Sequence, residues 1–345
     1  MKQLGTVSSN VTIFEVAAQA GVSYGTVSRV LNNDPHVRLE TRERVNKVIQ
    51  ELGYVVNRQA RSLAGGKTHI IGILVPDLGT GYIAEVIQGI DTELQLAGYD
   101  LMLYTTHRTP ILEANYVANL AQGVVDGLIL VLPRNPEDYI DTLKGRRFPF
   151  VLVDHQGSGD QCPAVNAANW QGAYNATEYL IQLGHKRIGF ITGWMDLGSS
   201  VDRLEGYKSA LWAHHIPFSE ELVRESNFQQ LDGYNRAMEL LNLSEPPSAI
   251  FAANDVMAFG AMDAIREQGK RIPEEVSLIG FDDIPQSSII HPALTTVRQP
   301  LRNMGSIAVQ LLFDVLKNPT APFKRIELPT GLVVRDSCQP PQSNP

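Results

Sequence analysis

The sequence of 345 residues has few cysteines, no long apolar run and no leader-like start. Cys162 and Cys338 are its only cysteines. They lie far apart without metal-ligand spacing around either, which argues against a disulfide framework and against a zinc site. No stretch is long and apolar enough to cross a bilayer, and residues 1–10 lack the apolar centre of a signal peptide. We therefore expect a cytoplasmic protein with no membrane contact and no metal or other cofactor.

The sequence also lacks the motifs of common enzyme classes. It has no G-x-S-x-G elbow, no P-loop, and no G-x-G-x-x-G segment with its acidic partner. His185 has no evident partner, and neighbouring His214 and His215 point to different sides of a helix, so that they do not share a metal easily. Because function has to be argued from sites, an enzyme on an α/β fold is an alternative that these residues do not support.

Charge is divided unevenly along the chain. The net charge is -8, but residues 1–67 hold nine Lys and Arg against five Asp and Glu, so this part carries +4 and the remainder -12. A small basic head on an acidic body indicates a polyanionic partner at one end of the chain. The length is too great for one compact core and suits a small module followed by two lobes.

Residues 12–53 show the pattern of three short helices. Thr12 and Glu15 form a T-x-x-E capping box, Gly21 ends the first helix, and Ser23 caps the second. A third helix is predicted over Thr41–Leu52, stopped by Gly53. Apolar residues recur at helical spacing at Ile13, Val16, Ala17, Ala20, Val27, Val30, Leu31, Val45, Val48, Ile49 and Leu52.

Two helices joined by a tight turn, the second with a polar outer face, are typical of a helix-turn-helix DNA reader. Arg29 on that face can donate two hydrogen bonds to a guanine edge, and Tyr24 lies on the first turn, where such helices reach bases. A helical bundle with a solvated polar face is the alternative. The DNA contacts that we expect in the head are Thr12, Ser23, Tyr24, Gly25, Thr26, Ser28, Arg29 and Asn32.

The stretch VTIFEVAAQAGVSYGTVSRVLNN, followed by ETRERVNKVIQELGY and NRQARSLAGG, resembles the head of the LacI/GalR (lactose repressor) family. The resemblance implies a DNA-binding transcription regulator in which Tyr24, Gly25 and Arg29 read the operator. Gly25 departs from the family pattern, which usually has a side chain at this position. We therefore expect one base contact to be missing, and the operator sequence does not follow from the resemblance.

The segment 56–67 is predicted to be a hinge. Asn57–Ala64 can form a two-turn helix stopped by Gly65-Gly66, but so short a helix is marginal in water unless something holds it. Asn57 and Arg61 would lie near DNA, and Leu63 would form a wedge between base pairs in the minor groove. Packing of Leu63 on the neighbouring domain is the alternative, and the family resemblance favours the wedge.

The body, residues 68–336, alternates apolar runs with amphipathic helices, which predicts two doubly wound parallel-sheet lobes. IIGILVPDLGTGY, LGHKRIGFITG, AIFAANDVMAFGAMDAI, VSLIGFDDI and ALTTVRQP resemble the same family and, through it, periplasmic sugar-binding proteins. The resemblance implies a first lobe of about 68–165 and 296–328 and a second of about 166–295 and 329–336. The head is expected over 11–55, and the tail, 337–345, is expected to be disordered.

Polar residues gather where predicted strands end, which is where doubly wound sheets bind ligands. Asp154 ends one strand, and Asn254 follows another. Their carboxylates and amides suit vicinal hydroxyls, Arg203 can donate to oxygens, and Phe228 or Trp194 can cover a sugar ring. Asp255 also stabilises a helix start without any ligand, and Trp194 can equally cover the lobe surface. The predicted ligand set is Tyr82, Asp154, Trp194, Arg203, Phe228, Asn254, Asp255, Asp282 and Gln299.

These observations predict a regulator, a repressor by family resemblance, whose operator affinity changes when a small molecule binds between the lobes. A sugar or sugar phosphate is expected as the effector, and a nucleobase or nucleoside is the alternative. A periplasmic binding protein is disfavoured by the missing signal peptide and by the basic head. The tail lacks the leucine heptads that make tetramers, so we expect a homodimer on a pseudo-palindromic operator.

Overall fold

The computed structural model describes residues 11–31, 34–54, 67–156 and 162–342. The chain divides into two compact units, the head (residues 1–68) and the body (residues 69–345), each of which is described by itself. The predicted DNA contacts Asn32, Asn57, Arg61 and Leu63 lie outside the described residues, and so does the predicted hinge helix.

The head consists of three helices, α1 (Ile13–Ala20), α2 (Tyr24–Leu31) and α3 (Leu39–Leu52). The predicted capping box is confirmed, since the Thr12 amide donates to Glu15 Oε2 at 2.6 Å and the Glu15 amide to Thr12 Oγ1. Gly21 and Gly53 both adopt positive φ, 63° and 61°, which a glycine accepts without strain. The helices enclose a small core of Val16, Ala17, Ala20, Val27, Val30, Val45 and Val48.

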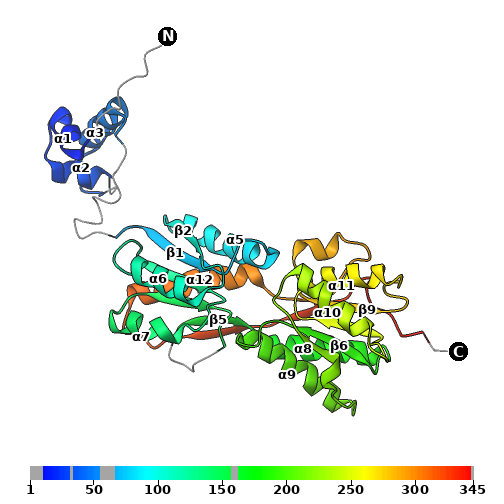
Figure 1. The fold of residues 1–345 in the computed structure, drawn as a ribbon. Coiled ribbons are helices and arrows are strands. Elements are labelled where there is room, and N and C mark those ends of the chain that lie inside the picture. Colours follow the sequence, from blue (N-terminus) through cyan, green and yellow to red (C-terminus); the bar gives the residue numbers. More distant parts are fainter. Residues whose placement is uncertain (1–10, 32–33, 55–66, 157–161, 343–345) are drawn as a thin grey trace, which may run out of the picture. The chain divides into compact units, whose positions relative to one another are not determined.

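The first lobe of the body is a six-stranded parallel sheet in the order β11-β5-β4-β3-β1-β2 (Figure 1). Its strands are β1 (Ile70–Val75), β2 (Asp100–Thr105), β3 (Gly127–Val131), β4 (Phe150–Val153), β5 (Ala164–Ala167) and β11 (Arg325–Leu328). Its helices are α5 (Gly81–Leu96), α6 (Pro110–Leu120), α7 (Glu137–Gly145) and α12 (Leu301–Lys317).

The side chains of β1 point alternately to the two faces of this sheet, and helices cover both faces. Ile71, Ile73 and Val75 join a core with residues of α5 and α12, whereas Leu74 joins a core with residues of α6 and α7. Successive side chains of a strand point to opposite faces, so a strand buried on both faces has a continuous apolar sequence. The run IIGILV is therefore apolar throughout.

The second lobe is a six-stranded sheet in the order β12-β10-β9-β8-β6-β7, parallel except for β12. Its strands are β6 (Ile188–Thr192), β7 (Val223–Glu225), β8 (Ala249–Ala252), β9 (Ser277–Asp282), β10 (Thr295–Arg298) and β12 (Gly331–Val333). Its helices are α8 (Asn169–Gln182), α9 (Gly198–Ala213), α10 (Gln230–Leu241) and α11 (Asp255–Glu267), with 3-10 turns η2 (Glu220–Leu222) and η3 (Pro285–Ser288). The first turn of α9 is made of small residues without apolar periodicity.

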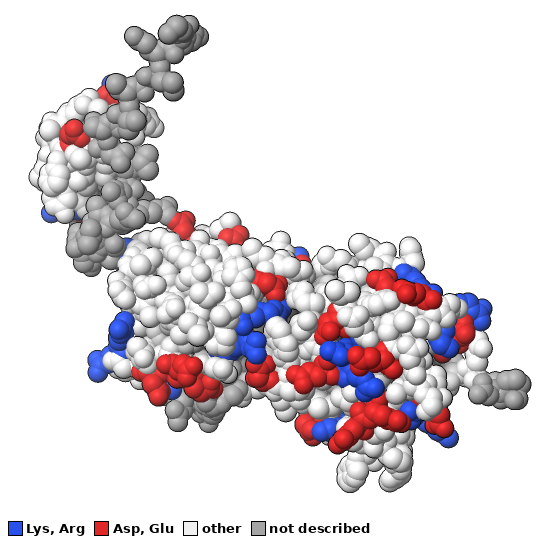
Figure 2. Space-filling view, in the orientation of Figure 1, with Lys and Arg blue, Asp and Glu red and all other residues white. Residues whose placement is uncertain are grey.

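The chain crosses between the lobes after β5, after β10, and between β11 and β12. The lobe boundary predicted at about residue 295 lies just after Arg298 in the structure, because Thr295–Arg298 still pair with β9 in the second sheet. The chain then returns, and α12, drawn in orange, packs with α5 in the first lobe (Figure 1). In Figure 2 side chains of both signs lie around the junction of the two lobes.

The prediction that residues 337–345 are disordered is wrong for the part of the tail that the structure describes. Ser337 is fully buried, donates from Oγ to the Leu278 carbonyl at 2.6 Å, and accepts from the Leu278 amide at 2.8 Å through its own carbonyl. Cys338 packs against the core of the second lobe. The polar, proline-rich sequence gave no sign of this docking, because the tail uses mainly hydrogen bonds to the start of β9 and not an apolar face.

Glu113 on α6 is buried and gives the first lobe a predicted pH dependence. It accepts from Tyr139 Oη at 2.5 Å and from the Arg134 amide at 3.2 Å, yet burial outweighs these bonds and raises the pKa of its carboxyl from 4.5 to about 7. The folded state therefore holds the proton more tightly than the unfolded state. The resulting stabilisation is complete below about pH 4.5 and is lost as the pH rises to about 7.

Glu113→Gln is expected to remove this dependence while keeping an oxygen that accepts from Tyr139. When the pH is raised from about 4.5 to about 8, the unfolding free energy of the wild type should fall by about 1–3 kcal/mol more than that of the variant. Urea unfolding of both proteins at the two pH values measures the difference. An equal pH dependence in the two proteins would show that Glu113 titrates normally.

Candidate functional site

The carboxyl ends of the strands in the two lobes face a common pocket with about 410 Å³ of empty volume, partly open to solvent. Both lobes contribute, as expected for two doubly wound sheets that meet at their ligand-binding edges. The lining residues are Pro76, Thr80, Tyr82, Ile83, Arg108, Leu132 and Asp154 from the first lobe and Ser199, Arg203, Phe228, Asn254 and Asp282 from the second.

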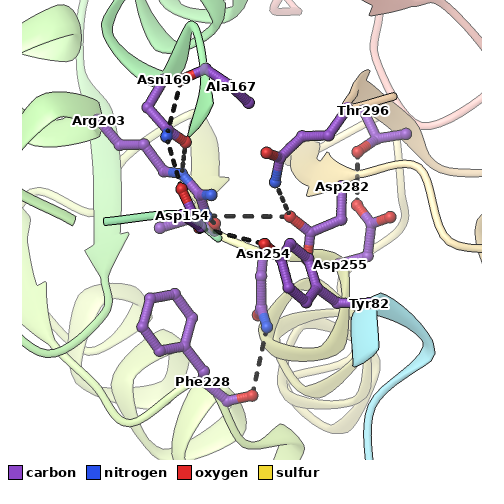
Figure 3. Close-up of polar contacts among 12 residues, drawn as sticks. Tyr82, Asp154, Ala167, Asn169, Arg203, Phe228, Asn254, Asp255, Asp282 and Thr296 are labelled. Atoms are coloured by element: carbon purple, nitrogen blue, oxygen red, sulfur yellow. Dashed lines mark hydrogen bonds and ion pairs between the residues drawn. The ribbon is translucent and has the colours of Figure 1, made fainter. Parts of the chain in front are cut away.

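Asp154 is the carboxylate of the first lobe, placed directly after β4. Its Oδ2 accepts from Tyr82 Oη at 3.3 Å, and its Oδ1 accepts from Asn169 Nδ2 at 3.2 Å and Gln156 Nε2 at 3.0 Å. Burial raises the pKa of Tyr82 well above its usual value, with Asp154 adding to the effect, so the phenol stays protonated as a donor. Figure 3 shows Tyr82 and Asp154 meeting at the pocket.

Asp282 and Arg203 form the charged centre of the second lobe (Figure 3). Arg203 is 3% exposed, lies 3.9 Å from Asp282 through Nη1, and donates to the Ala253 carbonyl at 2.5 Å. Gln299 Nε2 donates to Asp282 Oδ1 at 2.7 Å. Burial raises the pKa of Asp282, and Arg203 opposes that effect. The arrangement offers a fixed donor next to a fixed acceptor, which is what a vicinal hydroxyl pair needs.

Phe228 supplies an apolar wall and is held in a strained backbone conformation, with φ at 65°. Its carbonyl accepts from Asn254 Nδ2 at 3.3 Å, while Asn254 Oδ1 caps α11 by accepting from the Met257 amide at 2.8 Å. Asp154 and Asp282 also have positive φ, 56° and 115°. Three pocket residues thus sit in conformations that only their surroundings stabilise, a pattern typical of ligand sites.

The exposed face of α2 lies opposite its buried Val27 and Val30 and carries Arg29. Tyr24 on this face is 48% exposed, and its ring stacks on the ring of Phe14, with centroids 5.5 Å apart and planes at 27°. The start of α2 is held by Ser23, whose Oγ accepts from the Thr26 amide at 3.2 Å. A helix that shows a cation and an aromatic ring to solvent can reach into the major groove of DNA.

Known proteins share both parts of the chain. Residues 12–57 match the bacterial regulatory proteins of the lacI family, and residues 177–338 match a periplasmic binding protein-like domain. Catabolite control protein A of Priestia megaterium is 33% identical over 96% of this chain and 100% of its own length. The transcriptional repressor PurR of Proteus mirabilis is 36% identical over 94% of this chain and 96% of its own. The chain belongs to the LacI family.

Solved structures of the family agree with this fold. A lac repressor dimer bound to operator and an anti-inducer superposes with a TM-score of 0.86 at 31% identity, covering 96% of this chain and 100% of that one. An Enterococcus faecium LacI-family regulator with bound ribose gives 0.72 at 30% identity, covering 79% of this chain and 100% of that one. The predicted helical head and two-lobed α/β body are confirmed, and this LacI-family protein is a DNA-binding transcription regulator with an effector-binding domain. Among the described helices none is long and apolar enough to cross a membrane.

The pocket of this LacI-family regulator brings together most of the predicted ligand residues. Tyr82, Asp154, Arg203, Phe228, Asn254 and Asp282 line it, and Gln299 reaches it through its hydrogen bond to Asp282. Asp255 does not line it. The Asp255 side chain is fully buried and accepts from Thr296 Oγ1 at 2.5 Å, Ser287 Oγ at 2.7 Å and the Ile284 amide at 2.9 Å. Asp255 therefore holds the loop after β9 and the strand β10 in place, a role that the sequence did not predict.

Trp194 is the second predicted ligand residue that the described pocket excludes. Its ring lies instead against two guanidinium groups, with Arg108 Cζ 4.6 Å and Arg134 Cζ 4.7 Å from the ring centroid. Both arginines belong to the first lobe and Trp194 to the second. Sequence spacing does not reveal such a contact, because it depends on how far the lobes are closed.

Sequence reasoning missed Arg108, Leu132 and Ser199 in the pocket and Phe14 in the head. Arg108 follows β2 and Leu132 follows β3, so the strand-end rule that found Asp154 would have found both had it been applied to every strand. The signal for Phe14 is a large apolar residue on the polar side of α1, where it is 67% exposed. A Cβ on Gly25 would meet only Ser23 Oγ, at 3.9 Å, which is an ordinary contact, so the fold does not require a glycine there.

Gly193 is predicted to control the position of Phe228. A Cβ on Gly193 would lie 1.9 Å from Phe228 Cζ, so Gly193→Ala has to displace the ring from its place in the pocket wall. We expect a loss of about 1–3 kcal/mol of unfolding free energy from overpacking, measured by urea denaturation. Gly193→Ala combined with Phe228→Ala should be less destabilised than the sum of the single variants. Additive losses would show that the two residues do not compete for space.

Proposed function

We propose that this LacI-family regulator is a cytoplasmic repressor whose operator affinity is set by a sugar bound between the two lobes. The observation that carries the proposal is the pocket itself, in which Asp154 and Asp282 accept, Tyr82 and Arg203 donate, and Phe228 offers an apolar face. Polyhydroxylated rings present both hydroxyls and apolar C–H faces, and such a mixed lining suits them.

The charges of the pocket favour a neutral ligand over a phosphorylated one. Arg108 is bound by Asp77 through two hydrogen bonds of 3.0 and 2.7 Å, and Arg203 faces Asp282. Each lining arginine thus already has a carboxylate partner, and Asp154 adds a further carboxylate. A phosphate would have to compete with these ion pairs and approach buried carboxylates.

The DNA partner is proposed to be a pseudo-palindromic duplex bound by a homodimer. The α2 surface around Tyr24 and Arg29 supplies base contacts, and a two-fold dimer matches two half-sites. Support comes from the lac repressor, which is a dimer on its operator in the structure compared above. Bound ribose and cellobiose in structures of similar regulators support the sugar, and a nucleobase or nucleoside is the alternative outcome of the test.

A ligand screen followed by a DNA-binding assay tests the proposal. Ligands that bind only the folded state raise the melting temperature, so the full-length protein is heated with sugars, sugar phosphates, nucleosides and bases. Each hit is then added to a fluorescence-anisotropy titration with an operator selected from a random duplex library. A neutral sugar that changes operator affinity supports the proposal. A response only to bases or nucleosides would replace the sugar, and failure to select any duplex would overturn the regulator model.

A further inference from the structure

We propose that Arg108, Arg134, Trp194 and Asp196 form an interlobe clasp that holds the effector cleft closed, with Trp194 as its central positioning residue. The clasp rests on the proposed effector role of the cleft. Arg108 and Arg134 follow β2 and β3 of the first lobe, and Trp194 and Asp196 follow β6 of the second. Both guanidinium groups lie less than 5 Å from the Trp194 ring centroid, and Arg134 forms an ion pair with Asp196.

Each half of the clasp is anchored within its own lobe. Arg108 is held by Asp77, and Arg134 donates from Nη1 to the Arg108 carbonyl at 3.4 Å. In the second lobe the Met195 amide donates to Glu225 Oε1 at 3.3 Å, which ties the Trp194 loop to the end of β7. The two halves are therefore preorganised, and contact between them depends on the separation of the lobes rather than on local rearrangement.

The lobes also touch at two glycines away from the clasp. A Cβ on Gly81 in α5 would lie 3.0 Å from Ile284 Cβ, and a Cβ on Gly198 in α9 would lie 2.8 Å from Gln156 Cβ. A Cβ at either point would lie closer to the opposite lobe than ordinary van der Waals contact allows. The structure is thus closed tightly across the cleft, and opening it requires the Trp194 and Asp196 contacts to break.

Arg108 connects the clasp to the pocket. It lines the pocket and contacts Trp194, whereas Trp194 itself does not line the pocket. A cation over an indole ring and a partly exposed ion pair each shift an equilibrium by a few-fold, so the whole clasp shifts closure by about 10-fold. A ligand that binds only the closed cleft has an apparent affinity equal to its intrinsic affinity multiplied by the fraction of molecules that are closed. Because the clasp raises this fraction, it lowers the concentration of effector that is required.

Quenching of Trp194 fluorescence measures whether the clasp is formed, and the measurement needs no ligand. The chain has three tryptophans, so a full-length parent carrying Trp170→Phe and Trp212→Phe leaves Trp194 as the only emitter. Trp212 is 82% exposed, and a phenylalanine at residue 170 keeps the ring that stacks on Tyr174. Acrylamide quenching is measured in this parent and after Arg134→Met, Arg134→Lys or Lys208→Met. Lys208 lies over Phe218 within the second lobe and is the matched control.

Arg134→Met is expected to raise the quenching constant at least about 2-fold, Arg134→Lys to restore much of the protection, and Lys208→Met to change nothing. Raising salt from about 0.05 M to about 1 M should increase quenching in the parent but not in Arg134→Met, because the ion pair is screened. Hydrogen exchange around Gly81 and Ile284 should also accelerate in Arg134→Met, since these segments meet only when the lobes close.

Equal quenching in the parent and Arg134→Met would overturn the clasp. Faster quenching without faster exchange around Gly81 would also overturn it, because Trp194 would then be uncovered locally with the lobes still closed. Neither measurement needs an effector or an operator. The clasp and the proposed sugar response can therefore fail independently.

Discussion

Asp282→Asn is expected to lower effector affinity at least about 100-fold while leaving the protein folded. The substitution keeps the shape and the oxygen that accepts from Gln299, but it removes the charge that would accept ligand hydroxyls next to Arg203. Hydrogen bonds to charged groups contribute about 1.5–3 kcal/mol each, so the loss of one or two of them has this size. Sugars that raise the melting temperature of the wild type should no longer do so.

Asp282→Asn should raise the unfolding free energy above neutral pH, although it lowers effector affinity. Burial raises the pKa of the Asp282 carboxyl, so the charged form is unfavourable in the folded state, and an amide relieves that cost above neutral pH. Asp263→Asn on the exposed side of α11 is the matched control and should change neither property. A wild-type ligand response in Asp282→Asn would place the effector outside this pocket.

Arg29→Ala is expected to weaken specific operator binding by about 1–3 kcal/mol per half-site, which corresponds to roughly 5- to 150-fold. Arg29 is exposed on α2, and a bidentate contact to a guanine discriminates against other bases. Binding to random duplex should weaken much less, because it depends on phosphate contacts. Anisotropy titrations with operator and with random duplex at one salt concentration measure the two affinities.

Arg44→Ala provides the control for Arg29. Arg44 is also exposed and lies on α3, outside the α2 face, so any loss of affinity should be equal for operator and random duplex. An unchanged ratio of operator to random affinity in Arg29→Ala would remove Arg29 from the reading surface. The α2 face would then serve only to dock the head on the backbone.

Rules that involve only residues close together in the sequence predicted much of this fold. The Thr12 and Glu15 capping box and the stop at Gly21 depend on residues within one turn of each other, and the structure confirms them. The apolar run IIGILV forms β1, because a strand that is buried on both faces has a continuous apolar sequence. Asp154 and Asp282 were found because strand ends gather ligand-binding groups.

Contacts between distant segments escaped these rules. Ser337 forms hydrogen bonds with Leu278 that the polar sequence of the tail does not predict. The Asp255 side chain accepts a hydrogen bond from Thr296 and does not line the pocket. The sequence by itself determined the helical head, the two-lobed body and the type of pocket, since these follow from periodicity and from groups at strand ends. Only the tertiary structure decided that Trp194 meets Arg108 and Arg134, because that contact depends on the closure of two separately folded lobes.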